Sequence, residues 1–99
     1  MIKICKYDLG RYCNIAKTII PVTGLLKDIL DIQFQRGRAV LWGEVDTSVP
    51  GTSQFYIDAR CTGEERPQDP NFKYIKTLQG EDELAYHFYA WNPMEGFDI

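Results

Sequence analysis

The chain has 99 residues, enough for one small domain with a modest core. Hydrophobic residues make up 44% and charged residues 25%, a balance that is typical of a folded globular protein and excludes a disordered chain. The formal net charge of −3 excludes a general attraction to nucleic acid or anionic lipid, and leaves room only for a local basic patch.

Cysteine and histidine are too few for a zinc site or a disulfide framework. Cys5, Cys13 and Cys61 form no Cys-x-x-Cys pair, and His87 is the only histidine. The N-terminus lacks the apolar stretch of a signal peptide, and no apolar run approaches the roughly 20 residues that span a bilayer. We therefore expect a cytoplasmic protein with reduced thiols, no metal and no cofactor.

The N-terminal third predicts two strands and one helical turn. Residues 2–9 indicate an edge or near-edge strand. Residues 14–22 form a weaker strand that is interrupted by Pro21, which suits a sheet edge or a bulge. Residues 24–29, with leucine and isoleucine at helical spacing, are the one place where a helical turn fits.

A β-hairpin is the strongest local prediction. Residues 30–35 alternate apolar and polar without error, and residues 39–45 form a second β-type run. The arginine–glycine–arginine link at 36–38 contains a glycine that can take a positive φ. The hairpin side chains that we expect to face the core are Leu30, Ile32, Phe34, Leu41 and Val45.

Three further strands follow, at 55–61, 72–78 and 84–91, and the proline-rich stretch 62–71 is the longest loop. The side chains expected to face inward from the first and last of these strands are Phe55, Ile57, Ala59, Leu84, Tyr86 and Phe88. The irregular tail ends in Phe97 and Ile99, which could dock on a surface or a partner. Six or seven short strands predict a mainly β domain over residues 1–99, a small antiparallel sandwich or barrel.

The outward positions mix aromatic rings with amides and cations, a combination that is typical of a recognition surface. The alternative is that a second sheet or subunit covers these residues. The residues that we expect to bind a ligand are Gln33, Gln35, Arg36, Arg38, Trp42, Tyr56, Arg60, His87 and Tyr89.

Two groups of titratable residues need separate interpretations. His87 has no second histidine and no nucleophile beside it, so we favour a hydrogen-bonded strand histidine over a general base. Five cations would form an anion site if their strands are neighbours, and would otherwise be scattered solubilising charges. These cations are Arg36, Arg38, Arg60, Lys73 and Lys76.

Motifs of common enzymes are missing. The sequence has no Walker A loop, no Gly-x-Gly-x-x-Gly, no Gly-x-Ser-x-Gly and no His-Glu-x-x-His. We therefore expect a protein that binds and does not catalyse.

Several stretches resemble a family of small uncharacterised proteins common in phages and prophages. The hairpin carries the most specific of them, Gln33-x-Gln35-x-Gly37 followed by Leu41-Trp42-x-x-Val45-Asp46. Tyr74-Ile75-x-Thr77 and His87-Phe88 follow in the same order as in the family. The family has no biochemical role to carry over, and the resemblance implies a phage origin.

Small accessory phage proteins often counter host defence. The resemblance therefore implies a homo-oligomer in the host cytoplasm that sequesters a nucleotide immune signal, such as a cyclic dinucleotide or a cyclic ADP-ribose isomer, without turnover. The alternatives are a protein-binding inhibitor of a host defence or nucleic-acid-handling protein, and a minor virion component. We expect no membrane partner and no direct binding to nucleic acid.

Overall fold

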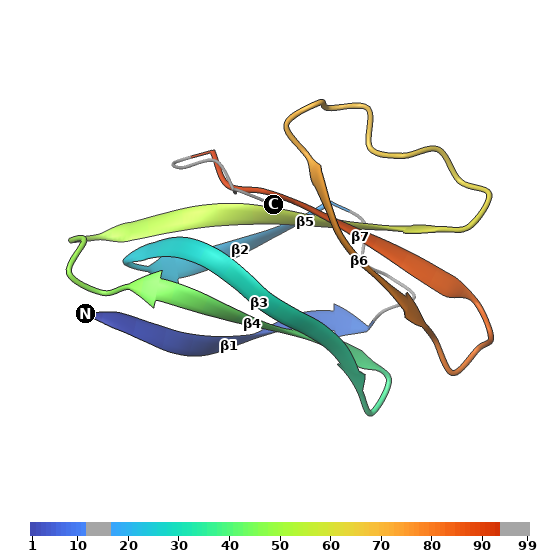
Figure 1. Cartoon of the computed structure of the whole chain (residues 1–99), viewed down its shortest axis with the longest axis horizontal. Helices are drawn as coiled ribbons and strands as arrows, with labels where there is room; N and C mark the ends of the chain where they lie inside the picture. Colours follow the sequence, from blue (N-terminus) through green and yellow to red (C-terminus); the bar gives the residue numbers. More distant parts are fainter. Residues whose placement is uncertain (12–16, 94–99) are drawn as a thin grey trace.

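The computed structural model describes residues 1–11 and 17–93, which form seven strands in two antiparallel sheets (Figure 1). The strands are β1 (Ile2–Arg11), β2 (Thr18–Thr23), β3 (Leu25–Gln35), β4 (Arg38–Asp46), β5 (Thr52–Cys61), β6 (Lys73–Gln79) and β7 (Ala85–Trp91). Among these residues there is no helix that is long and apolar enough to cross a membrane.

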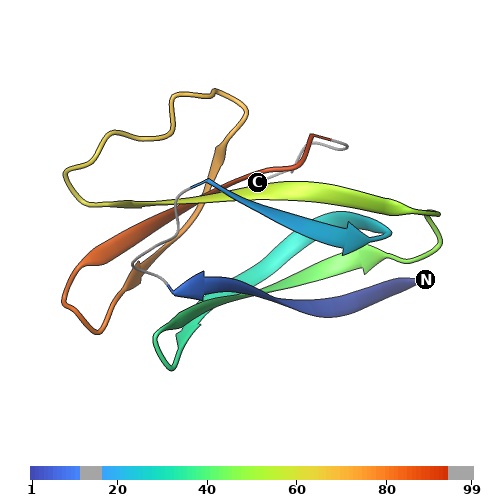
Figure 2. The ribbon, with the colours of Figure 1, turned by 180° about the vertical axis from the view of Figure 1, so that it is seen from behind.

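The two sheets pack face to face as a small β-sandwich. Sheet A has the strand order β1-β4-β3, and sheet B has the order β2-β5-β7-β6. Figures 1 and 2 show the two layers from opposite sides, joined by the connections from β2 to β3 and from β4 to β5. The predicted β class is confirmed, and the sandwich is the correct one of the two predicted architectures.

The core lies between the sheets and is built from alternate residues of each strand. Leu41 and Ile32 of sheet A, and Phe55, Ile57 and Phe88 of sheet B, have no exposed surface. Burying each such side chain contributes about 1.5–3 kcal/mol, so this interlayer core is what stabilises the fold. The inward positions predicted for the central strands β4, β5 and β7 are confirmed. The exception is Leu84, which lies just before β7 and is exposed.

The predicted helical turn at 24–29 is wrong, because these residues are the beginning of β3. The register of β3 against β4 breaks between Leu26 and Asp28 and again between Ile29 and Asp31. Each bulge adds one residue to the period of two that a strand requires, so side chains three positions apart face the same side. Leu26, Ile29 and Ile32 therefore mimic a helical period while packing into the core of a sandwich.

Two expected core residues, Leu30 and Leu84, lie at the surface because neither holds a regularly paired strand position. Leu30 is 46% exposed because it sits in the second bulge of β3. Leu84 is 50% exposed because it lies before the first residue of β7, next to the turn that contains Glu83. Pro21 lies on β2, an edge strand of sheet B, as the sequence predicted.

Some predictions concern residues outside the described part of the chain. The first residues of the weak strand at 14–22, and the tail with Phe97 and Ile99, are among them. Of the cysteines, Cys5 and Cys61 are half-buried free thiols, and Cys13 is likewise outside the described residues.

Candidate functional site

The nine residues expected to bind a ligand divide between the two outer faces of the sandwich. Because Leu41 faces the core, its neighbour Trp42 faces outward from sheet A, and the same alternation turns Tyr56, His87 and Tyr89 outward from sheet B. The sheet A set is Gln33, Gln35, Arg36, Arg38 and Trp42; the sheet B set is Tyr56, Arg60, His87 and Tyr89. One copy of the chain therefore does not bring the nine residues together.

An open depression of about 880 Å³ lies on the outer face of sheet A, at the end where β3 turns into β4. It is lined by Lys6, Asp8, Gln35, Arg36, Arg38 and Val40. The strand register explains this grouping, because Asp8 lies opposite Val40 and Gln35 lies opposite Arg38. Three cations and one carboxylate thus surround a hollow on a protein whose net charge is −3.

Arg38 is held in the depression through its Nε atom. This nitrogen donates to Oδ1 and Oδ2 of Asp8 at 3.1 and 2.8 Å. Asp8 is itself fixed, because its Oδ1 accepts from the backbone N–H of Gly10 at 2.9 Å. Arg38 and this second bond hold the pKa of the Asp8 carboxyl below its ordinary value. Within the described chain the two terminal nitrogens of Arg38 have no hydrogen-bond partner.

Arg36 occupies the first position of the two-residue turn between β3 and β4. Its φ is 53° and that of Gly37 is 77°, the positive pair that characterises a type I′ turn. Asparagine, aspartate or glycine is usual at the first position, and an ordinary side chain there costs about 1–2 kcal/mol. The Arg36 side chain makes no hydrogen bond or ion pair with any described residue, so its own side-chain contacts do not offset this strain.

Trp42 extends the outer face of sheet A beyond the depression. It lies two residues after Val40 on β4, about 7 Å along the strand. The Nζ atom of Lys6 lies 5.8 Å from the centroid of the Trp42 ring, a cation–π contact. The half-buried indole is therefore adjacent to the cations of the depression.

Gln33 and Lys76 both bind Asp31, which lies on β3 of sheet A. Gln33 Nε2 donates to Asp31 Oδ2 at 2.8 Å, and Lys76 Nζ pairs with Asp31 Oδ1. Lys76 comes from β6, so this ion pair links the open edges of sheets A and B. Lys76 and Gln33 lower the pKa of the Asp31 carboxyl. Of the two alternatives for the cations, Lys76 therefore does not join the arginines in one anion site, because Asp31 binds it at the sheet edges.

On sheet B, the loop at 62–72 folds against the outward side chains. Thr62 bonds to His87, the carbonyl of Glu65 accepts from Arg60, and the ring of Phe72 lies 6.0 Å from that of Trp91. Asp58 faces outward from β5 and is nevertheless only 4% exposed. The outer face of sheet B is thus partly covered by the chain itself.

Arg60 has a partner for each nitrogen of its guanidinium. Nε and Nη2 donate to the two carboxylate oxygens of Asp58, and Nη1 donates to the Glu65 carbonyl at 3.1 Å. Asp58 raises the pKa of the arginine further. Arg60 therefore fastens the loop to β5 and does not join Arg36 and Arg38, which lie on the other face.

His87 and the tyrosines of sheet B also have partners within the chain. The two ring nitrogens of His87 bond to Thr62 and Thr77, both at 2.8 Å. Tyr56 stacks on Trp91 with a ring separation of 5.3 Å, and Tyr89 meets Tyr74 edge to face. His87 is thus a hydrogen-bonded strand histidine, and a ligand would have to displace a threonine to reach it.

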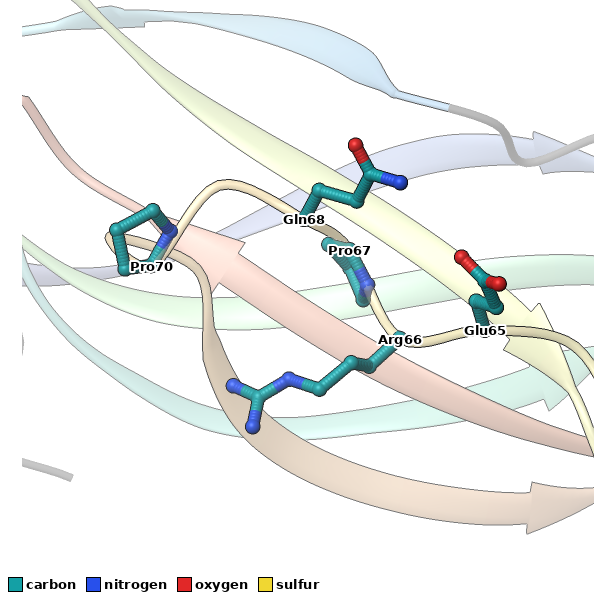
Figure 3. Close-up of a pocket in the computed structure, with 5 residues that line it drawn as sticks. All are labelled: Glu65, Arg66, Pro67, Gln68 and Pro70. Atoms are coloured by element: carbon teal, nitrogen blue, oxygen red, sulfur yellow. The ribbon is translucent and has the colours of Figure 1, made fainter.

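A second hollow, of about 530 Å³, is formed by the loop itself and lined by Glu65, Arg66, Pro67, Gln68 and Pro70 (Figure 3). The side chains of Glu65 and Gln68 extend to one side of the loop and that of Arg66 to the other. With a single cation and no converging polar groups, this hollow is chemically less specific than the depression on sheet A. Across the described ranges 1–11 and 17–93, no cluster of metal-ligating side chains occurs.

Lys6 and Asp8 are the two charged residues of the depression that were not predicted as site residues. Their alternation on β1 places both on one face of that strand. Only the pairing of β1 with β4, between residues more than thirty positions apart, brings them beside Arg38. No local signal contains this information.

A family model described as Domain of unknown function (DUF7352) matches residues 1–96. No curated protein and no solved structure matches the chain.

Proposed function

The chain belongs to the DUF7352 family of domains of unknown function, and we propose that it binds a small nucleotide ligand on the outer face of sheet A. The observation that carries this proposal is the depression lined by Lys6, Arg36 and Arg38, where Asp8 is the one carboxylate among the described lining residues. On a chain with a net charge of −3, such a local excess of positive charge favours a small anion over extended nucleic acid.

Phosphate is the anion that these groups suit best. Among the described residues the terminal nitrogens of Arg38 have no partner, while its Nε atom is anchored by Asp8, so the guanidinium presents a fork of fixed orientation. Arg36 adds a second guanidinium on the adjacent turn, and Lys6 adds a point charge. Together they fit one or two phosphate groups.

Trp42 supplies the surface for a base. Aromatic stacking is worth about 1–3 kcal/mol per base, and a base that stacks on the Trp42 ring would replace Lys6 there and free its ammonium group for the phosphate. Gln35 lines the depression and can direct a hydrogen bond to the base or sugar, whereas Gln33 is already bonded to Asp31. This assignment narrows the site to one face and leaves Tyr56, Arg60, His87 and Tyr89 out of it.

The wider role follows from the resemblance to small phage and prophage proteins. In this proposal the protein acts in the host cytoplasm and counters host defence by holding a nucleotide immune signal without turning it over. A cyclic dinucleotide or a cyclic ADP-ribose isomer has the phosphates and bases that the depression would bind.

A thermal-shift screen tests the proposal. Cyclic dinucleotides, cyclic ADP-ribose isomers and mononucleotides would each be added to the purified protein. A ligand at a hundred times its dissociation constant stabilises by about 2.7 kcal/mol, which raises the melting temperature by many degrees in a domain of this size. Chromatography of the released ligand would show it intact.

Two variants locate the binding. Arg38→Ala should abolish the shift, and Arg66→Ala, in the loop hollow, should retain it. A panel without any shift would overturn nucleotide binding and direct the search to protein partners.

A further inference from the structure

The edges of the two sheets differ in how well they are protected from pairing with another chain. Four strands are edges, namely β1, β3, β2 and β6. A regular edge presents unpaired N–H and C=O groups, and natural sheets block it with proline, bulges or lysine. Pro21 interrupts β2, two bulges interrupt β3, and one bulge interrupts β6 between Tyr74 and Lys76.

The first part of β1 has no such interruption. Residues from Ile2 to Asp8 pair with β4 in unbroken register, and the bulge comes only after Asp8. Ile2 and Ile4 face outward from this segment and are 51% and 69% exposed. An edge in unbroken register that carries two exposed isoleucines is a surface for strand pairing.

The lysines of β1 do not close this edge. Lys6 is directed over the Trp42 ring of its own sheet, 5.8 Å from the centroid. Lys3 alternates to the other face of the strand from Ile2 and Ile4, so it does not oppose contact between their side chains.

We propose that a second copy of this chain pairs with this edge. The two β1 strands would run antiparallel to each other, related by a two-fold axis near Ile4. The interface is then self-complementary, as a two-fold dimer requires. Facing residues would be Ile4 with Ile4, Ile2 with Lys6, and Lys3 with Cys5. No like charges face each other in this register, and each isoleucine covers apolar surface, including the aliphatic stem of a lysine.

This pairing would join the two copies of sheet A into one continuous sheet. It would also bury the two most exposed apolar side chains of β1 outside the depression. The inference does not rest on the proposed function, since the pairing needs no ligand, and Lys6 is the one residue that both use.

Sedimentation velocity of the intact chain over about 1–100 µM tests it. The wild type should sediment at twice the chain mass of 11.4 kDa. Ile4→Lys would place two ammonium groups opposite each other and should reduce the mass to that of one chain. The matched control is Ile19→Lys, on the proline-interrupted edge β2, where the native side chain is 52% exposed; it should remain dimeric.

Circular dichroism would establish that both variants stay folded. A wild type that sediments as a single chain throughout this range overturns the inference. So does a dimer that Ile4→Lys leaves intact or that Ile19→Lys dissociates.

Discussion

Arg38 and Asp8 are joined through the Nε atom of the arginine, which donates to both carboxylate oxygens at 3.1 and 2.8 Å. Both side chains are about half exposed, so the pair adds little to stability. The consequence of this pair is that the Arg38 guanidinium is held in one orientation. The carboxylate holds the Nε side of the guanidinium, and in the proposed function the terminal nitrogens would then bind phosphate.

Arg38→Lys should therefore weaken nucleotide binding although the charge is kept. The donors of an ammonium group all lie on one nitrogen, so a lysine that pairs with Asp8 cannot also offer phosphate a planar two-nitrogen fork. Loss of one charge-assisted hydrogen bond of about 1.5–3 kcal/mol corresponds to roughly a tenfold or greater rise in the dissociation constant. Isothermal titration calorimetry with the ligand found by thermal shift would measure it.

The matched control for that experiment is Arg66→Lys, which makes the same exchange in the loop hollow. Its dissociation constant should equal that of the wild type. Equal affinities for Arg38→Lys and the wild type would show that the anchored fork has no part in binding.

Arg36→Asn should stabilise the protein and weaken its ligand binding. The φ of 53° at this position is unfavourable for arginine and acceptable to asparagine, so the free energy of unfolding should rise by about 0.5–1 kcal/mol. The same change removes a cation from the depression. Urea unfolding and calorimetry measure the two effects separately.

Glu83 provides the control, because it is the other described non-glycine residue with a positive φ, at 66°. Glu83→Asn should give a similar gain in stability and leave binding unchanged, since this turn lines neither hollow. If Arg36→Asn binds as well as the wild type, the strain at Arg36 has no connection with the ligand.

Much of the fold could be predicted because strand periodicity is local. Alternation identified the core positions Leu41, Phe55 and Phe88 without knowledge of the partner strands. The start of β3 could not be predicted, because its bulges add residues that convert a period of two into one of three. A bulge depends on the facing strand, and the residues themselves do not mark it.

The site was harder to predict than the fold for the same reason. Alternation correctly turned Trp42 and Tyr89 outward, and it contains no information on which sheet each strand joins. The sequence-based prediction therefore put residues from two opposite faces of the sandwich into one site. The covering of sheet B by the loop at 62–72 depends on tertiary contacts such as that between Arg60 and the Glu65 carbonyl.

Asp31→Asn should destabilise the protein at neutral pH and have little effect in acid. The folded state holds the pKa of this carboxyl below its unfolded value, because Lys76 and Gln33 bind the charged form. The stabilisation is therefore present above the unfolded pKa of about 3.9 and is lost as the pH falls through the lower folded value. The side chains of both partners are about one third exposed, so we expect less than about 1 kcal/mol.

Urea unfolding at several pH values between 2 and 7 would measure this difference. Asp28→Asn is the control on the same strand, because among the described residues its carboxylate accepts only from the backbone N–H of Ile29. Its effect on the free energy of unfolding should not show the pH dependence expected for Asp31→Asn. A difference between Asp31→Asn and the wild type that is the same at pH 2 and pH 7 would contradict the ion-pair explanation.

Asn92→Ala should be among the most destabilising single changes at a polar residue. Asn92 follows β7, is 3% exposed, and donates from Nδ2 to the Leu26 carbonyl of β3 at 2.8 Å, so it ties sheet B to sheet A. Its removal leaves a buried carbonyl without this donor, which costs about 1–3 kcal/mol, or some 4–8 °C in melting temperature per kcal/mol. Asn71→Ala, at an exposed turn where the only described partner of the amide is nearby Asp69, should change the melting temperature by far less. If thermal unfolding shows equal effects for the two variants, then the amide of Asn92 does not hold the sheets together and the apolar core alone does so.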